Sequence, residues 1–193
     1  MKNVLLGVTG SIAAYKAAEI ARLLVKRGFS VNVIMTKSSE RFITPLTFQT
    51  LTKHKVYTDM FEEIFYEDVR HISLAKNADI AVVAPATANI IGKLASGIAD
   101  DMLSTVLMAM GGNPGGNPAD KPIIICPAMN TAMWDNKIVQ DNIKKLRGRG
   151  FLFVEPEESE LACGDTGRGA LAEADAIADA AIALLEKSVN TNK

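Results

Sequence analysis

Residues 123–134 read IIICPAMNTAMW, an apolar run that leads into a loop of unusual composition. The run 123–126 predicts a central parallel strand covered on both faces, and Pro127 ends it because proline cannot donate to the strand ladder. The loop places Asn130 between two methionines and ahead of Trp134, the only tryptophan of the chain. Ligands of open α/β sheets bind beyond the carboxyl ends of the strands, so this loop is a candidate ligand site. The alternative is core packing, with Asn130 as the cap of the next helix.

Three upstream segments repeat the pattern of a buried strand followed by a polar loop. The strands are predicted at 3–9, 30–35 and 78–85, and a helix is predicted over 12–26 from apolar residues spaced by three and four. With the later segments, the chain forms six strand–helix units. They predict a three-layer α/β/α sandwich on a parallel sheet, flavodoxin-like or Rossmann-like.

The loops after the first two strands favour a phosphorylated cofactor over NAD or ATP. Ser11 begins a helix, where N–H groups and the helix dipole hold phosphate, although a plain serine cap has the same sequence pattern. The segment lacks the complete GxGxxG fingerprint, and the chain has no P-loop motif. The second strand ends in hydroxyls and Lys37 instead of the acidic residue that binds an NAD ribose. Alternatively, Ser38 or Ser39 caps the helix predicted to begin near Glu40.

Composition predicts one globular domain over residues 1–187, followed by a disordered tail over 188–193. The 193 residues are 48% hydrophobic and 22% charged, enough for a full core. A net charge of −1 is too small to attract nucleic acid or an anionic membrane. Two cysteines without a CxxC motif favour neither a disulfide framework nor a zinc site, so no metal is expected. Without a signal peptide or a long apolar run, the expected location is the cytoplasm.

The remaining segments include two residues of chemical interest. His71 precedes an apolar helix, a position more typical of a structural histidine. Residues 111–120 read GGNPGGNPAD and predict a surface loop; helices follow over 135–147 and 175–185, with a strand over 151–154. Residues 155–170 are predicted to be irregular. They contain Cys163 beside glycine, for which structural and functional roles are equally compatible.

Several motifs together resemble the flavin-dependent cysteine decarboxylases, a family of homo-oligomeric flavoproteins. Residues 127–134, with the pattern PAMNxxMW, resemble the family signature, and 85–89 resemble its flavin loop, with Thr87 where serine is usual. Residues 97–101 and the following helix also match, although Asp100 and Asp101 are equally compatible with simple helix capping. Residues 161–170, LACGDTGRGA, resemble the family's substrate-covering flap.

The resemblance covers nearly residues 3–186 and implies roles for individual residues. It places catalytic roles at His71, Asn130 and Cys163, and substrate contacts at Asn130, Met133 and Ala162. It places contacts with FMN at Gly10, Ser11, Ile12, Ala13, Thr36, Lys37, Ser38, Thr87, Ala88, Asn89, Ile90 and Ala128. It also implies assembly as homotrimers, or as a dodecamer of four trimers.

Within the family, the chain resembles most the lyases that decarboxylate 4'-phosphopantothenoylcysteine to 4'-phosphopantetheine in coenzyme A biosynthesis. Oxidation of the cysteine Cβ by FMN makes a thioaldehyde, which accepts the electrons released by CO2 loss; the resulting ene-thiol is then reduced. In this reading His71 orients the substrate or manages a proton, Asn130 holds it, and Cys163 donates a proton. A separate phosphopantothenate-cysteine ligase is a possible partner.

Two alternatives stay open. A peptidyl-cysteine decarboxylase of the lantibiotic type releases the ene-thiol and needs no reductive proton donor, which Cys163 argues against. A non-catalytic flavin-binding regulatory protein, like the fungal phosphatase-inhibiting relatives, carries a long acidic tail, whereas this chain ends in Asn-Thr-Asn-Lys.

Overall fold

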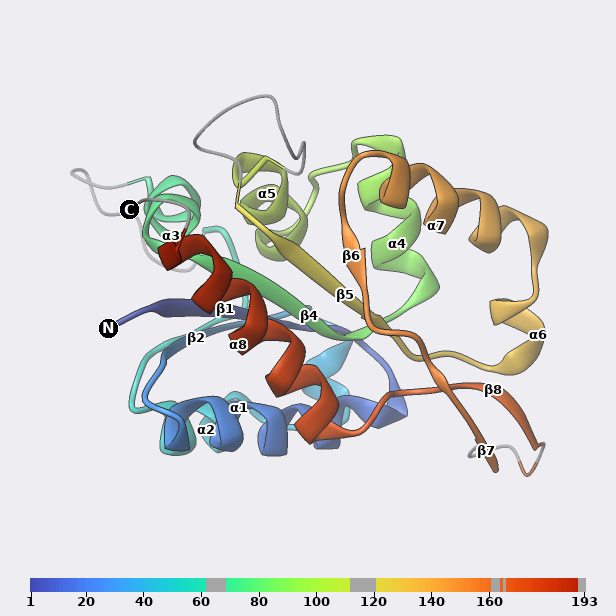
Figure 1. Ribbon diagram of the computed structural model, residues 1–193, viewed down its shortest axis with the longest axis horizontal. Helices are drawn as coiled ribbons and strands as arrows, with labels where there is room; N and C mark the ends of the chain where they lie inside the picture. Colours follow the sequence, from blue (N-terminus) through green and yellow to red (C-terminus); the bar gives the residue numbers. More distant parts are fainter. Residues whose placement is uncertain (62–68, 112–120, 161–163, 165, 191–193) are drawn as a thin grey trace.

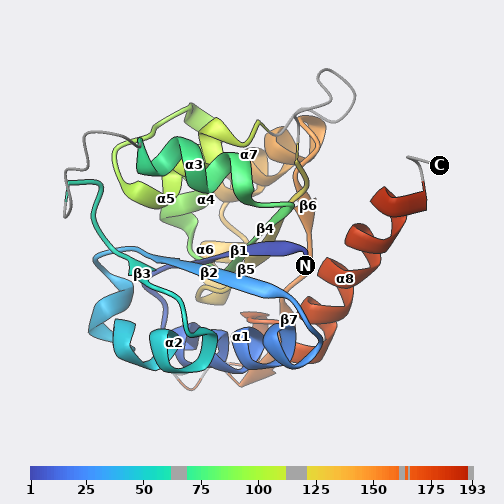
Figure 2. The ribbon, with the colours of Figure 1, turned by 90° about the vertical axis from the view of Figure 1, so that its left-hand side faces the viewer.

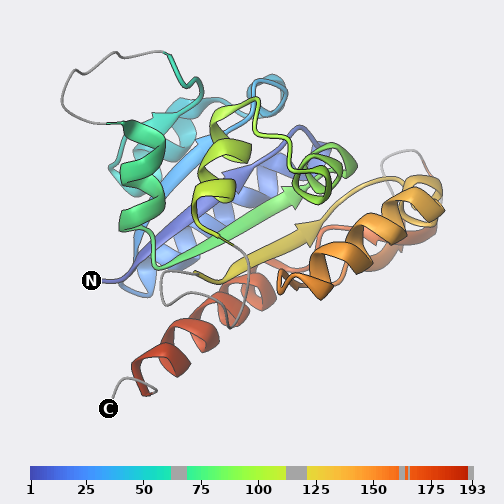
Figure 3. The same cartoon turned by 90° about the horizontal axis from the view of Figure 1, so that it is seen from above.

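A computed structural model describes residues 1–61, 69–111, 121–160, 164 and 166–190 (Figure 1). Its centre is a six-stranded sheet in the order β3-β2-β1-β4-β5-β6, and every neighbouring pair is parallel. Figure 3 shows the strands lying side by side. The strands are β1 (Asn3–Val8), β2 (Ser30–Met35), β3 (Val56–Tyr57), β4 (Ile80–Ala86), β5 (Ile123–Pro127) and β6 (Leu152–Phe153). This order is the doubly wound, Rossmann-type order, so the predicted fold class is confirmed.

Helices cover both faces of the sheet (Figure 2). On one face lie α1 (Lys16–Lys26), α2 (Pro45–Thr52) and α8 (Ala174–Asn190), and on the other lie α3 (Arg70–Asn77), α4 (Ala88–Ser96), α5 (Met102–Ala109) and α7 (Lys137–Gly148). Short helical turns η1 (Ile12–Tyr15), η2 (Ser39–Arg41) and α6 (Thr131–Trp134) follow β1, β2 and β5. None of the helices in the described residues has the length and apolar character needed to cross a membrane.

The two faces of β1 show why the central strands are apolar throughout. Val4, Leu6 and Val8 are fully buried against the layer of α1 and α8, while Leu5 points into the opposite layer. On that second face α5 approaches the sheet closely, because a Cβ at Gly7 would lie 2.6 Å from Leu103 Cδ1. Alternation of side chains across a strand therefore places β1 in both cores at once.

Two segments differ from their sequence-based predictions. In the described part of residues 155–170, predicted to be irregular, β7 (Glu157–Glu160) and β8 (Thr166–Ala170) pair as antiparallel strands, termed the hairpin. The predicted helix over 135–147 is preceded by the separate turn α6, and α7 begins only at Lys137. Helix α8 continues to Asn190, while residues 191–193, and residues 112–120 of the predicted surface loop 111–120, lie outside the described residues.

Candidate functional site

A cleft of about 530 Å³ opens where the carboxyl ends of β1, β2, β4 and β5 meet. The chain leaves β1 toward β2 on one side and returns to β4 on the other, so the cleft lies at the topological switch point of the sheet, the usual ligand position in such folds. It is lined by Thr9, Gly10, Ser11, Thr36, Lys37, Ser38, Thr87, Ala88, Asn89, Ile90, Lys93, Asp101, Ala128, Met129 and Met133.

Thr9 joins two walls of the cleft. Its hydroxyl donates to the carbonyl of Pro85 at 2.7 Å and accepts the N–H of Thr87 at 3.0 Å. The side chain is only 2% exposed, so both bonds form away from solvent. Sequence reasoning missed this residue because it was read as the last residue of a buried strand. The hydroxyl holds the loop after β1 against the start of α4.

The loops after β1 and β2 both line the cleft and are in direct contact with each other. A Cβ at Gly10 would lie 2.4 Å from Ser38 Cβ and 3.1 Å from the Ser38 carbonyl carbon, so only glycine permits this approach. Ser11 caps η1, because its hydroxyl accepts the N–H of Ala13 at 3.3 Å. The cap reading of Ser11 is thus correct, and the residue also lines the cleft.

The first turn of α4 forms another wall. Thr87 is its N-cap residue but its side chain makes no capping hydrogen bond, whereas the turn itself, through Ala88, Asn89 and Ile90, lines the cleft. The first N–H groups of a helix have no partner within the helix, and they carry the positive end of its dipole. This wall can therefore hold an anion such as phosphate.

A charged cluster lies further along the same helix. Lys93 Nζ contacts Asp100 at 2.6 Å and Asp101 at 2.7 Å. Burial of Lys93 favours the neutral amine, but the hydrogen bonds to the two carboxylates outweigh it and raise the pKa of Lys93. Burial of Asp101 opposes ionisation, yet hydrogen bonds from Lys93 and Ser104 lower the pKa of Asp101. Both Lys93 and Asp101 line the cleft as charged groups.

Lys93 was not predicted from the sequence, whereas Asp101 was predicted either as part of the family motif at 97–101 or as a simple helix cap. Asp101 does cap α5, in a capping box with Ser104. One signal could have found Lys93: it follows Asn89 by four residues on one helix, which places both side chains on the same face.

The loop after β5, residues 128–134, is termed the signature loop. Asn130 caps α6, since its Oδ1 accepts the N–H of Ala132 at 2.8 Å. Met129 and Met133 line the cleft, whereas Trp134 is 6% exposed and packs beneath. Both readings of the loop are therefore correct: one part packs in the core and another part faces the cleft.

The cleft contains all the predicted cofactor contacts except Ile12 and Ala13. Ile12 points outward on η1 and is 58% exposed, and Ala13 packs against the core on the α1 side. Of the predicted substrate contacts, Met133 lines the cleft, Asn130 lies between two lining residues, and Ala162 falls outside the described residues.

Of the predicted catalytic residues, His71 and Asn130 are described, and they lie apart within one chain. His71 lies in the first turn of α3 and is not among the residues that line the cleft. Figure 1 shows α3 and α6 on opposite sides of the molecule, and Figure 3 separates them as well. Cys163 lies outside the described residues. The roles of His71, Asn130 and Cys163 stay predictions.

The donor set of the cleft fits FMN. Hydroxyls of Ser11, Thr36 and Ser38 and the first turn of α4 surround one part of it, which suits a phosphate and a polyhydroxyl chain. Apolar side chains of Ile90, Ala128, Met129 and Met133 form another part, which suits a flat ring.

Comparison with known proteins agrees with this geometry. The profile of the family described as Flavoprotein matches residues 1–186. The chain is 51% identical over 176 residues to the coenzyme A biosynthesis bifunctional protein CoaBC of Bacillus subtilis, covering 91% of this chain but 41% of that protein. It is 46% identical to the probable phosphopantothenoylcysteine decarboxylase of Streptococcus mutans, covering 91% of this chain and 94% of that protein.

Solved structures resemble the fold over almost the whole chain. A PPC decarboxylase mutant complexed with pantothenoylaminoethenethiol superimposes with a TM-score of 0.85 at 32% identity, covering 96% of this chain and 98% of that one. The FMN binding protein AtHal3 superimposes with a TM-score of 0.82 at 33% identity, covering 96% and 97%.

Proposed function

The chain belongs to the flavoprotein family, and we propose that it binds FMN in the cleft and decarboxylates 4'-phosphopantothenoylcysteine to 4'-phosphopantetheine. One observation carries the proposal: the hydroxyl-lined loops after β1 and β2 and the methionines of the signature loop line a single cleft. The S. mutans relative named for this reaction, matched over 94% of its length, supports the substrate class.

The walls of the cleft would hold FMN by its phosphate and its ring. Ser11, Ser38 and the first turn of α4 would bind the phosphate, and Ile90, Ala128 and Met129 would pack against the ring. When bound, FMN supplies a hydride acceptor for the cysteine Cβ and later a hydride donor for the decarboxylated product.

The residues of the chain hold the substrate and exclude water. The Asn130 amide is fixed in place by its cap on α6, and its NH2 group is the donor that would bind the substrate carboxylate. Met133, 48% exposed beside it, would cover the substrate thiol and keep water away from the reacting atoms. Cys163 would donate the proton at carbon in the last step.

Within one chain His71 does not line the cleft, so its proposed role would need a second copy of the chain. We propose a homotrimer, alone or as part of a dodecamer, in which a neighbouring copy presents His71 to orient the substrate or move a proton. Apolar side chains support an interface here, because Ile12, Tyr15 and Phe42 are all about half exposed on the turns that follow the cleft loops. Size measurement by light scattering tests this, and a monomer would contradict it.

The reaction is tested directly with the purified protein. It should show flavin absorbance, the extracted cofactor should have the mass of FMN, and incubation with 4'-phosphopantothenoylcysteine should yield 4'-phosphopantetheine by mass analysis. A colourless protein that fails to take up FMN would overturn the cofactor assignment. Flavin binding without turnover would favour the regulatory alternative.

Two variants and one control test the roles of His71 and Asn130. His71→Asn and Asn130→Asp should both keep FMN bound but lose bleaching of the flavin by substrate. In Asn130→Asp the loss is expected because the new carboxylate repels the carboxylate of the substrate. The matched control is Asn136→Asp, because Asn136 caps α7 in the same way, accepting the N–H of Ile138 at 2.9 Å, but does not line the cleft. A variant that bleaches flavin at the parent rate would lose its assigned role.

Cys163→Ser separates the two decarboxylase readings. It should oxidise and decarboxylate the substrate and then stall, releasing a product two hydrogens lighter than 4'-phosphopantetheine. Normal product at an undiminished rate would remove Cys163 from the mechanism, and with it the argument from Cys163 against a peptidyl-cysteine decarboxylase. The chain spans about two fifths of the length of the bifunctional CoaBC relatives. We further propose that a phosphopantothenate-cysteine ligase supplies the substrate.

A further inference from the structure

Strand β8 lies against the signature loop through its backbone. The N–H of Met129 donates to the carbonyl of Gly169 at 2.9 Å, and a Cβ at Gly169 would lie 2.2 Å from the carbonyl oxygen of Met129. Two residues earlier, a Cβ at Gly167 would lie 2.5 Å from Thr131 Oγ1. Glycine at both positions therefore allows the strand to touch the loop from either side of Arg168.

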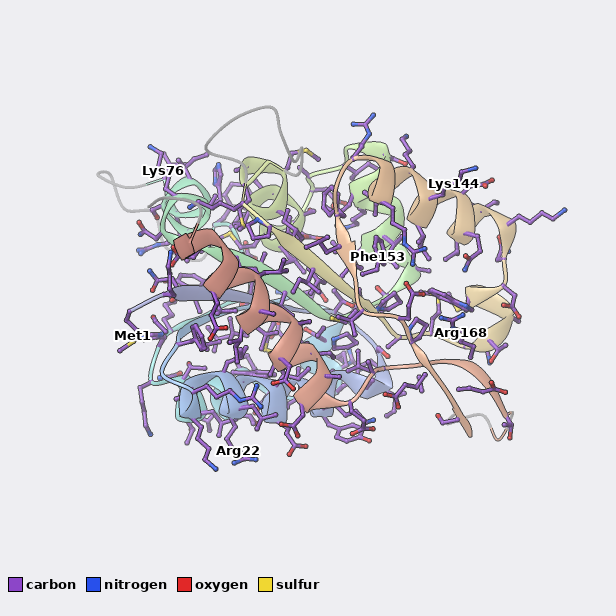
Figure 4. The ribbon with its side chains drawn as sticks, in the orientation of Figure 1. Met1, Arg22, Lys76, Lys144, Phe153 and Arg168 are labelled. Carbon is purple, nitrogen blue, oxygen red and sulfur yellow. The ribbon has the colours of Figure 1, made fainter. Side chains whose placement is uncertain are left out.

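The side chain of Arg168 adds a contact that the glycines cannot make. Its guanidinium carbon lies 5.6 Å from the centre of the Trp134 ring, within range for a cation–π contact. The same side chain donates to the carbonyl of Pro156 at 3.3 Å and to Glu155 at 3.2 Å. Figure 4 shows Arg168 where β8 passes α6. One side chain thus connects the end of α6 to the segment that begins β7.

Glu155 anchors this arrangement to the rest of the fold. It also pairs with Arg147 near the end of α7, and the Arg147 guanidinium lies 5.0 Å from the centre of the Phe153 ring on β6. Two arginines, each over an aromatic ring, therefore share one carboxylate. The network fixes Arg168 relative to the sheet and not only relative to the hairpin.

Helix α6 has little support of its own. It consists of four residues, Thr131–Trp134, and a single helical turn is not stable in isolation. Its position depends on the cap at Asn130, on burial of Trp134 and on the strand that passes over it. Met133, which lines the cleft, immediately precedes the ring that Arg168 covers.

We propose that Arg168 is a positioning residue for the signature loop: by stacking on Trp134 and pairing with Glu155, it holds Asn130 and Met133 in the orientation that binds substrate. The inference rests on the proposed function, because substrate binding by Asn130 and Met133 is part of that proposal. The contact between β8 and the signature loop can nevertheless be tested without any substrate. The guanidinium stacks through its plane and donates from several nitrogens at once, which a lysine ammonium cannot reproduce.

The experiment compares Arg168→Ala and Arg168→Lys in the protein as purified. Arg22→Ala serves as the matched control, because Arg22 is similarly exposed (52% against 50%) and pairs with Glu19 on α1, away from the loop (Figure 4). Two readouts need no substrate: hydrogen exchange of the Met129 amide, and emission of Trp134, the only tryptophan. Arg168→Ala should speed the exchange of the Met129 amide about two- to fivefold, because the free energy of an exposed cation–π contact corresponds to that ratio. It should also shift the emission of Trp134 to the red.

Kinetics complete the test. Arg168→Ala should raise KM about two- to fivefold while kcat changes less, and Arg168→Lys should restore part of that loss. Exchange and emission equal to those of Arg22→Ala would overturn the proposal, whatever the kinetics. Faster exchange with an unchanged KM would overturn it too, because the contact would then hold the loop without positioning substrate. A parent protein without turnover would instead contradict the proposed function, while exchange and emission would still test the contact.

Discussion

Gly10→Ala should separate the two loops that close the cofactor end of the cleft. The added Cβ would lie 2.4 Å from Ser38 Cβ and 3.1 Å from the Ser38 carbonyl carbon. Carbon atoms normally pack at about 3.5–4.0 Å, so the loops must move apart by roughly 1 Å. The obstacle includes backbone, so rotation of a side chain cannot relieve it. The backbone at Gly10 is outside the left-handed region, so the effect comes from crowding alone.

The expected cost follows from the crowding. Overpacking of a well-packed site lowers the free energy of unfolding by about 1–3 kcal/mol, or roughly 2–12 °C in Tm for a domain of this size. Because both loops line the cleft, the dissociation constant for FMN should rise about tenfold, the ratio that 1.4 kcal/mol corresponds to.

The assay is urea unfolding of the cofactor-free protein, together with FMN titration followed by flavin fluorescence. Gly148→Ala is the control, because a Cβ there meets nothing within 4 Å and the residue ends α7. Alanine in a helix is favoured over glycine by about 0.5–1 kcal/mol, so the control should be neutral or stabilised. If Gly10→Ala unfolded and bound FMN like the parent, the two loops would not be in contact and the reasoning would be refuted.

Three further predictions address the walls of the cleft and the hydrophobic core. Thr9→Val should lower the free energy of unfolding by about 1–3 kcal/mol, since it leaves the Thr87 N–H without its buried acceptor; Thr9→Ser, which keeps the hydroxyl, should lose less in the same urea assay. Because the pKa of Asp101 is lowered in the folded protein, its pairing with Lys93 stabilises the fold above about pH 4 and is lost as the pH falls further. The stability difference between the parent and Lys93→Met should therefore shrink below pH 4 in urea unfolding, and a constant difference would contradict the pairing. Burial raises the pKa of Cys126, so in Cys163→Ser protein the remaining thiol should react with a thiol reagent only after unfolding.

The sheet could be predicted because its signals are local. Each central strand is an apolar run followed by a polar loop, and the predicted bounds of β2, residues 30–35, are those found. The loops after β1, β2, β4 and β5 then meet at one edge as a property of parallel topology. This is why the predicted cofactor contacts come together although they are far apart in sequence.

The hairpin and the roles of Thr9 and Lys93 in the cleft could not be predicted, because they depend on tertiary contacts that leave little signal in the local sequence. Residues 164–169 contain three glycines and no apolar alternation, so nothing local predicts β8; its shape comes from the approach of Gly167 and Gly169 to the signature loop. The hydroxyl of Thr9 bonds to the carbonyl of Pro85, which is 76 residues away in the sequence. Lys93 meets its carboxylates only after the chain reverses at Gly97, whose φ of +73° allows the turn.

The docking of α8 has a consequence for the order in which the chain can fold. Ile177 and Ala181 of α8 lie in the same buried cluster as Ala17 and Ala21 of α1, and Arg27 at the end of α1 contacts Asp175 at 3.2 Å. These contacts join segments about 150 residues apart, and loops of that length close late. During synthesis, the part of the apolar surface of α1 that packs on α8 emerges early but stays uncovered until α8 leaves the ribosome, although other parts of α1 can already pack on the sheet and on α2. Until α8 has been made, the nascent chain therefore carries an apolar surface that is prone to aggregation, and docking of α8 removes that surface.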